Sequence, residues 1–115
     1  MTLTPGDVVV VPFPYSDALA EKKRPAVVVS SRQLERDHGL VWLAMITSTS
    51  RLWKGDVPVT DLHAAGLPTS CSVRSAKVAT VSVERIDRRI GSLRASDWKA
   101  VRAALDRYSA SSPRK

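Results

Sequence analysis

Short runs of β-branched and apolar residues, each bounded by Gly, Pro or polar residues, recur along most of the chain. Three of them are clear, at residues 7–11 (DVVVV), 26–30 (AVVVS) and 40–47 (LVWLAMIT). Short apolar runs between such breakers are typical of buried strands. A weaker run at 57–59 contains Pro58, which predicts an edge strand. The last strand is expected at 73–83, where strict alternation would place Val73 and Val81 on one face.

A short helix is expected directly after the second of these strands. Ser30 or Ser31 can serve as its N-cap, and Ser30 with Gln33 has the spacing of a capping box. Gly39 is predicted to end the helix, because glycine is common just past helix C-termini.

The C-terminal segment predicts the clearest helix, at about residues 97–109. Ser96 is a suitable N-cap, and Asp97 falls in the first turn, where a negative charge is favourable. One apolar stripe is formed by Trp98, Val101, Leu105 and Tyr108. The tail 110–115 is expected to be frayed. Several strands and one packing helix predict a single, mainly β domain over residues 1–115, built as a small, strongly curved sheet or barrel.

The composition adds one strong signal, a formal net charge of +7 in 115 residues. This balance favours an anionic partner such as a nucleic acid or an acidic protein segment. The apolar runs are short and no signal-peptide pattern opens the chain, so no membrane association is expected. A single cysteine, Cys71, excludes an internal disulfide and fits a reducing compartment. The two histidines and this cysteine lack metal-ligand spacing, so we expect a cytoplasmic protein without metal or cofactor.

Three cations, Lys22, Lys23 and Arg24, close the connection 14–25 between the first two strands. This connection is longer than most hairpin loops, and long loops on rigid sheets often bind ligands. Because Pro25 restricts Arg24 to extended backbone conformations, we expect Arg24 at the base of the loop in a fixed position and the two lysines in its mobile part. The alternative is that all three are solvated surface charges.

Hydroxyl side chains end the third strand in the stretch TSTS, which begins with Thr47 and Ser48. Such hydroxyls can hydrogen-bond a phosphate without adding charge. They are equally common in ordinary turns, so the pattern by itself is weak.

Five short motifs, in order, resemble those of the MazF/PemK family of toxin ribonucleases from type II toxin–antitoxin pairs. They are GDVVVVPF, KRPAVVVSS, LAMITSTS, SVRSAKVATVSVERI, and the turn at residues 90–93 that leads into an Ala-rich helix. The resemblance implies an SH3-like barrel that forms a homodimer and cleaves single-stranded RNA without a metal. It also implies a cognate antitoxin that binds through a flexible acidic segment.

The resemblance carries over to particular residues. It implies that Arg24 and a strand-end hydroxyl, best matched by Thr47 with Ser48 beside it, are catalytic. The RNA 2′-OH would attack the adjacent phosphate, giving a 2′,3′-cyclic phosphate and a free 5′-OH. Since arginine keeps its proton, we assign Arg24 to stabilising the developing negative charge rather than to acting as a base. Proton donation to the leaving oxygen is a second role open to Arg24, and Thr47 would position or donate to the phosphate.

RNA contacts are expected from the remaining cations and one aromatic residue near these motifs, namely Lys22, Lys23, Trp53, Lys54, Arg74 and Lys77. Trp53 could stack on an unpaired base, whereas Trp42 is expected in the core or a dimer interface. Many relatives read Lys-Ile-Arg-Thr where this chain has Ala79 as the third residue, so a contact made by that arginine is missing or moved.

Other functions remain open on the sequence alone. His38 and His63 could form an acid–base pair, although both fall in polar connections where surface histidines are common. Cys71 is expected to be an inert thiol. A barrel of this type could also bind nucleic acid without cleaving it, or poison gyrase, but the second branch relies on a terminal Trp-Gly-Ile, and this chain ends in SSPRK.

Overall fold

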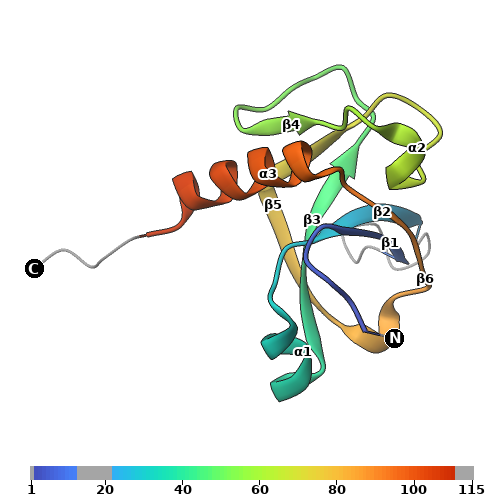
Figure 1. The fold of residues 1–115 in the computed structure, drawn as a ribbon, viewed down its shortest axis with the longest axis vertical. Coiled ribbons are helices and arrows are strands. Elements are labelled where there is room, and N and C mark those ends of the chain that lie inside the picture. Colours follow the sequence, from blue (N-terminus) through green and yellow to red (C-terminus); the bar gives the residue numbers. More distant parts are fainter. Residues whose placement is uncertain (1, 13–21, 111–115) are drawn as a thin grey trace, which may run out of the picture.

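A computed structural model describes residues 2–12 and 22–110 of the chain. In these segments, six antiparallel strands form a curled sheet in the order β4-β5-β3-β2-β1-β6, with the helix α3 lying across it (Figure 1). The strands are β1 (Asp7–Pro12), β2 (Lys23–Val28), β3 (Leu40–Thr47), β4 (Asp56–Pro58), β5 (Ser72–Ser82) and β6 (Arg88–Ser92). The helices are α1 (Arg32–His38), α2 (Leu62–Ala65), the 3-10 turn η1 (Val83–Arg85) and α3 (Ala95–Tyr108). The mainly β fold with a C-terminal helix confirms the predicted class.

Both faces of the central strands are buried, which explains why their sequences are continuously apolar rather than alternating. Val8 and Val27 belong to a cluster that also contains Val101 and Ala104 of α3, which we call the helix-side core. The neighbouring residues Val9, Ala26 and Val28 belong to a second cluster, which we call the opposite core. This cluster consists of Leu3, Val9, Val11, Ala26, Val28, Val41, Leu43, Val81 and Ile86. Successive residues of a strand therefore supply the two cores in turn.

Strand β5 changes its face partway along its length. Its pairing with β3 runs from Ala44↔Val78 directly to Met45↔Arg74, so three residues of β5 have no counterpart in β3. Because of this bulge, Val73 packs in the helix-side core and Val81 in the opposite core. The prediction that strict alternation places both on one face was wrong, since periodicity does not reveal the three additional residues of β5.

Strand β2 begins three residues earlier than predicted. Lys23 and Arg24 lie opposite Pro12 and Val11 of β1, so Arg24 is part of the strand rather than of the loop before it. Pro25 is tolerated because the pairing of β2 with β3 starts only at Ala26, and a proline without its N–H fits where a strand has a partner on one side only. Most of the predicted loop 14–25 and all of the tail after residue 110 lie outside the described residues.

Two elements were not predicted from the sequence, and one helix boundary was misplaced. Strand β6 has two arginines and a glycine among five residues, and α2 has only four residues, so neither shows an apolar pattern. The helix α3 begins at Ala95, which places Ser96 inside the first turn instead of at the N-cap. Asp97 is buried, and its carboxylate accepts hydrogen bonds of 2.8 Å from the Thr60 N–H and hydroxyl, which anchors the start of the helix.

The predicted short helix is α1, and Gly39 ends it in the left-handed conformation as expected. Its N-cap is Ser31, whose side chain makes no capping hydrogen bond. Ser30 does not form a capping box, because its hydroxyl accepts a 3.0 Å hydrogen bond from the backbone N–H of Trp42 in β3.

Replacing Gly66 by alanine is expected to destabilise the protein by about 3 kcal/mol, because two penalties add. Gly66 has a φ of 73°, and a Cβ there would overlap the backbone oxygen of Ile90 in β6. Gly39 is the matched control, since it has a φ of 65° but a Cβ added to it would meet no atom within 4 Å. Gly39→Ala should therefore cost only about 1 kcal/mol. Urea unfolding of both variants measures the difference, and equal losses would contradict the close packing of α2 against β6.

Candidate functional site

The strands β2 and β3 separate at the end of the sheet that carries Arg24. Their last paired residues are Ala26 and Met45. The structure gives no pairing between the two strands beyond this point, so Arg24 and Thr47 lie past the end of the ladder. Arg24 lines a cavity together with Pro25, Ile46 and Ser48, and Thr47 is not among its lining residues. The structure thus brings Arg24 to the same cavity as Ser48, and the role of Thr47 stays a prediction.

The hydroxyl of Thr47 is held in place by the turn that follows β3. Its Oγ1 accepts a 3.2 Å hydrogen bond from the backbone N–H of Thr49, and the Thr49 hydroxyl accepts the N–H of Arg51 in the same way. Since a hydroxyl carries one proton and two acceptor positions, Thr47 can still donate its proton to a ligand.

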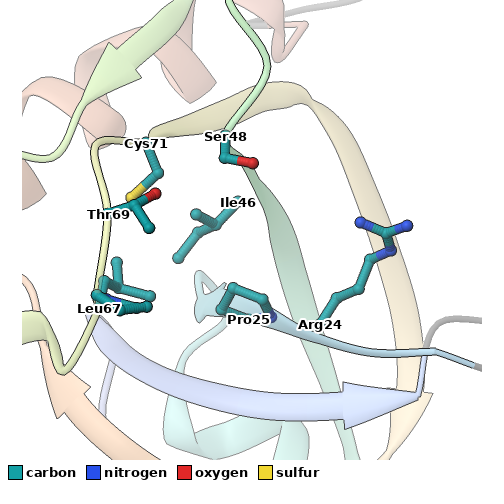
Figure 2. Close-up of a pocket in the computed structure, with 8 residues that line it drawn as sticks. Arg24, Pro25, Ile46, Ser48, Leu67, Thr69 and Cys71 are labelled. Atoms are coloured by element: carbon teal, nitrogen blue, oxygen red, sulfur yellow. The ribbon is translucent and has the colours of Figure 1, made fainter.

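Ser48 directly follows β3 and lines this cavity, whose volume is about 250 Å³. Figure 2 shows Arg24 at one side of this cavity and Leu67, Thr69 and Cys71 at the other, with the apolar side chains of Pro25 and Ile46 between them. The cavity is therefore an apolar hollow with polar groups on its rim, which suits a flat ring bearing a charged substituent.

A second hollow of about 370 Å³ continues from the first and shares Ser48 and Cys71 with it. It is lined mainly by hydroxyl side chains, those of Ser48, Thr49, Ser50, Ser70 and Ser72. Together the two hollows form a groove that runs from Arg24 along the ends of β3, β4 and β5.

The segment 67–71 between α2 and β5 is the part of this groove that was not predicted. It supplies Leu67, Pro68, Thr69 and Cys71 to the cavity wall. A Pro-Thr-Ser-Cys stretch is an ordinary turn signal, so nothing in the sequence showed that it faces the Arg-Pro motif. Burial raises the pKa of the Cys71 thiol above its usual value, which keeps the thiol protonated at neutral pH and fits the predicted lack of reactivity.

Arg74 is not the surface cation that was expected from its place in the sequence. Its guanidinium is buried and donates to both carboxylate oxygens of Asp56, at 3.2 and 2.9 Å, and to the backbone oxygen of Arg51 at 2.8 Å. The ring of Trp53 covers it, with 4.0 Å from the guanidinium carbon to the ring centroid. Although burial by itself raises the pKa of Asp56, the hydrogen bonds from Arg74 and Trp53 and the charge of Arg74 hold it below its ordinary value. Arg74 therefore holds the β3–β4 loop rather than offering its charge to a ligand.

The other predicted contact residues are spread over the surface. Lys22, Lys23 and Lys54 are exposed, and the ammonium of Lys23 lies 3.4 Å from Asp87. Lys77 is half-buried in the β5 bulge. Trp53 is 44% exposed, and its ring covers Arg74. Ala79 packs against the opposite core, so no charge is present at that position.

Two interpretations from the sequence are excluded by position. His38 ends α1 and His63 lies in α2, and these helices lie at opposite ends of the molecule (Figure 1), so they cannot form an acid–base pair. Trp42 is 47% exposed, which excludes the core as its position and leaves an interface as the alternative.

Neither a membrane span nor a metal cluster is found in the described part of the chain. No helix there has the length and apolar character needed to cross a membrane. Nor do residues 2–12 and 22–110 bring three or more His, Cys, Asp or Glu side chains together as metal ligands.

Comparison with known proteins places these features in a family. The toxin MazF-mt6 of Mycobacterium tuberculosis superposes with a TM-score of 0.71 at 25% identity, over 88% of this chain and 93% of that one. MazF of Deinococcus radiodurans shares the fold, with a TM-score of 0.76 at 19% identity over 94% and 96% of the two chains. An endoribonuclease in complex with its cognate antitoxin from a mycobacterial species shares it as well, with a TM-score of 0.70 at 16% identity over 92% and 91%. No curated protein sequence matches the chain. The model of the PemK-like, MazF-like toxins of type II toxin–antitoxin systems matches residues 4–108, and the chain therefore belongs to that family.

Proposed function

We propose that the protein is a sequence-selective, metal-independent endoribonuclease that cleaves single-stranded RNA at the groove beside Arg24. The observation that carries the proposal is the position of Arg24 and Ser48 on the rim of one cavity with apolar walls, with Thr47 directly before Ser48 in the chain. A structurally similar mycobacterial protein is described as an endoribonuclease, which supports the same activity here.

For this reaction the protein needs only to position the RNA 2′-OH against the phosphate and to stabilise the negative charge that develops there. The RNA 2′-OH attacks the neighbouring phosphorus, the bond from phosphorus to the 5′-oxygen breaks, and a 2′,3′-cyclic phosphate and a 5′-OH result. Negative charge grows on the non-bridging oxygens during this step. The Arg24 guanidinium and the Thr47 proton can donate to those oxygens, and such fixed donors lower the barrier most when they point to where charge develops.

The groove explains how a single strand could be held. An unstacked base fits the apolar cavity between Pro25, Ile46 and Leu67, with Ser48 at its rim. The hydroxyl-lined hollow offers hydrogen bonds to the sugar–phosphate chain that follows. Lys22 and Lys23 directly precede Arg24 in the chain and add positive charge near it. The exposed Lys54 and Trp53 offer a further charge and a stacking surface to a strand that extends beyond the groove. An antitoxin with an acidic, flexible segment would compete for the same charges, as a +7 protein attracts such segments quickly.

A long, unstructured RNA incubated with the protein in EDTA tests the proposal. We expect cuts at a small set of short sequences, with fragments that carry a 5′-OH and a 2′,3′-cyclic phosphate. Retention of the RNA without any cut would instead indicate a binding protein. Cleavage that requires added Mg²⁺ would contradict the proposed chemistry.

The two hydroxyls are expected to behave differently. Thr47→Val, which keeps the shape of the side chain, should lower the cleavage rate by about 10²-fold, since removal of one fixed donor to a developing oxyanion costs this much. Ser48→Ala should lower it less than about 10-fold and alter which base is preferred, because Ser48 lines the cavity. Single-turnover rates on one short RNA measure both. The reverse order of effects would assign the phosphate-contacting hydroxyl to Ser48.

A further inference from the structure

The cavity wall opposite Arg24 carries a hydroxyl that the proposed reaction does not use. Thr69 and Cys71 lie on this wall, and Figure 2 shows the Thr69 oxygen on the side that faces the cavity. The guanidinium of Arg24 lies at the other side, beyond Pro25 and Ile46. A nucleotide whose phosphate is bound at Arg24 therefore extends its base across the apolar floor towards Thr69.

The wall is held at both of its ends, which gives Thr69 a defined position. At one end the backbone N–H of Leu67 donates to the backbone oxygen of Leu62 at 2.9 Å, and Leu67 itself packs in the helix-side core. At the other end the backbone oxygen of Cys71 accepts the N–H of Val59 at 3.0 Å. A polar group on such a fixed segment can discriminate between ligands, because the ligand has to adapt to it.

The proton of the Thr69 hydroxyl already has a partner. Its Oγ1 donates to the backbone oxygen of Ser70 at 3.2 Å. Since a hydroxyl has one proton and two acceptor positions, Thr69 presents lone pairs to a ligand. The neighbouring Cys71 thiol is a weak donor, and Leu67 and Pro68 are apolar. The side chains that the structure describes on this wall therefore offer one good acceptor and no strong donor.

The group of a base that lies farthest from its ribose is the one that reaches this wall. In a pyrimidine that group is the substituent on C4, and in a purine it is the substituent on C6. Cytosine and adenine carry an amino group there, which donates hydrogen bonds, whereas uracil and guanine carry a carbonyl oxygen, which accepts them. The lone pairs of Thr69 thus attract cytosine and adenine, and a carbonyl base can be bound only if Thr69 gives up its hydrogen bond to Ser70.

We propose that Thr69 is a specificity-determining residue, which selects a base with an amino group, cytosine or adenine, in the cavity. The inference rests on the proposed function, since it takes single-stranded RNA as the ligand of the groove. It adds to that function the class of base that is bound and the side chain that selects it.

Binding of uncleavable strands tests the inference without requiring cleavage. Oligo(dC) and oligo(dU) of equal length lack the attacking 2′-OH, and their bases differ at C4 and the adjacent N3. We expect the wild-type protein to bind oligo(dC) about tenfold more tightly than oligo(dU) at neutral pH, which is the effect of roughly one hydrogen bond. Thr69→Val, which keeps the shape of the side chain, should bind the two strands equally. Fluorescence anisotropy measures the four affinities.

Two further variants separate selection of the base from a general effect on the wall. Thr69→Ser keeps the hydroxyl and should keep the preference for oligo(dC). Thr80→Val removes an exposed threonine hydroxyl of β5 that lines neither hollow of the groove, and it should keep the preference as well. If Thr69 only supported the wall, Thr69→Val would weaken both strands alike and leave their ratio unchanged. That result, or a wild-type ratio near one, would overturn the inference.

Cleavage distinguishes failure of this inference from failure of the proposed function. At a cut site mapped in a long RNA, replacing the bases beside the cut should reveal one position where cytosine or adenine is cut about tenfold faster than uracil or guanine. Thr69→Val should abolish that difference. If the protein cuts RNA but shows no such position, the role of Thr69 is overturned while the proposed function stands. If it discriminates the uncleavable strands but cuts no RNA, the proposed function is overturned while the role of Thr69 in binding stands.

Discussion

Replacing Arg24 by alanine is expected to reduce RNA cleavage by about 10³-fold or more while leaving the fold intact. One preorganised donor to a developing oxyanion is worth about 10²–10³ in rate, and a charged, two-pronged donor stabilises more than a neutral one. The stability of the fold should be almost unchanged, because the Arg24 side chain is exposed. Arg24→Lys should recover only part of the rate, since an ammonium keeps the charge but cannot bind two phosphate oxygens at once.

Lys23→Ala is the control for Arg24→Ala. Lys23 is the adjacent residue in β2, is also exposed, and pairs with Asp87 rather than pointing into the cavity. We expect its loss to weaken RNA binding modestly, with a smaller dependence on salt, and to leave the rate of the bound complex unchanged. Single-turnover measurements at saturating RNA separate the two effects. If Arg24→Ala cuts bound RNA as fast as the wild type, Arg24 is not part of the catalytic site.

Breaking the buried ion pair beneath Trp53 is expected to produce the largest loss of stability. Arg74 and Asp56 are 9% and 4% exposed in their side chains, and removal of one partner from such a pair costs about 3–5 kcal/mol because the other charge is left buried. Arg74→Met should therefore destabilise the protein by this amount in urea unfolding at pH 7. It should also slow RNA cleavage, since Arg74 fixes the loop that follows Ser48 through the Arg51 backbone oxygen.

A surface pair gives the matched control for Arg74→Met. Arg88 and Asp87 are joined at 2.7 Å, but their side chains are 63% and 33% exposed. Exposed pairs contribute about 0–1 kcal/mol, so Arg88→Met should lie within that range. Equal losses of unfolding free energy in the two variants would show that the Arg74–Asp56 pair contributes no more to stability than an exposed ion pair.

The same pair predicts how stability depends on pH. The pKa of Asp56 is lowered in the folded protein from an ordinary value of 3.8, so below about pH 4 the unfolded chain binds more protons than the folded one. The wild type therefore loses the contribution of this carboxylate as the pH falls through the folded pKa. In Arg74→Met that favourable contribution is absent, so the gap in unfolding free energy between the two proteins should narrow from pH 7 to pH 3. A constant gap would contradict the assigned charge state.

The sequence predicted strongly patterned elements well and irregular ones poorly. The bounds of β3 came out as expected, since an apolar run from Leu40 to Ile46, between Gly39 and the hydroxyl run that starts at Thr47, is typical of a buried strand. The Arg-Pro motif and the strand-end hydroxyls pointed to Arg24 and Ser48, which line one cavity, whereas Thr47 is not among its lining residues. The wall at residues 67–71 and the burial of Arg74 could not be predicted, because both depend on the β5 bulge and on which chain segments the sheet brings together. The sequence does not distinguish a cation that contacts RNA from one that pairs with a buried carboxylate, as Arg74 does.

The two edge strands of the sheet, β4 and β6, affect whether copies of this protein can pair strand to strand. Strand β4 has only three residues and includes Pro58, while β6 has two exposed arginines and an irregular register with β1. Short length, proline, charge and bulges are the devices by which proteins prevent open strand edges from pairing with one another. Continuous sheets across neighbouring molecules, the first step towards amyloid-like aggregation, are thus disfavoured at both ends. Neither edge strand is therefore expected to recruit further copies of this chain by strand pairing.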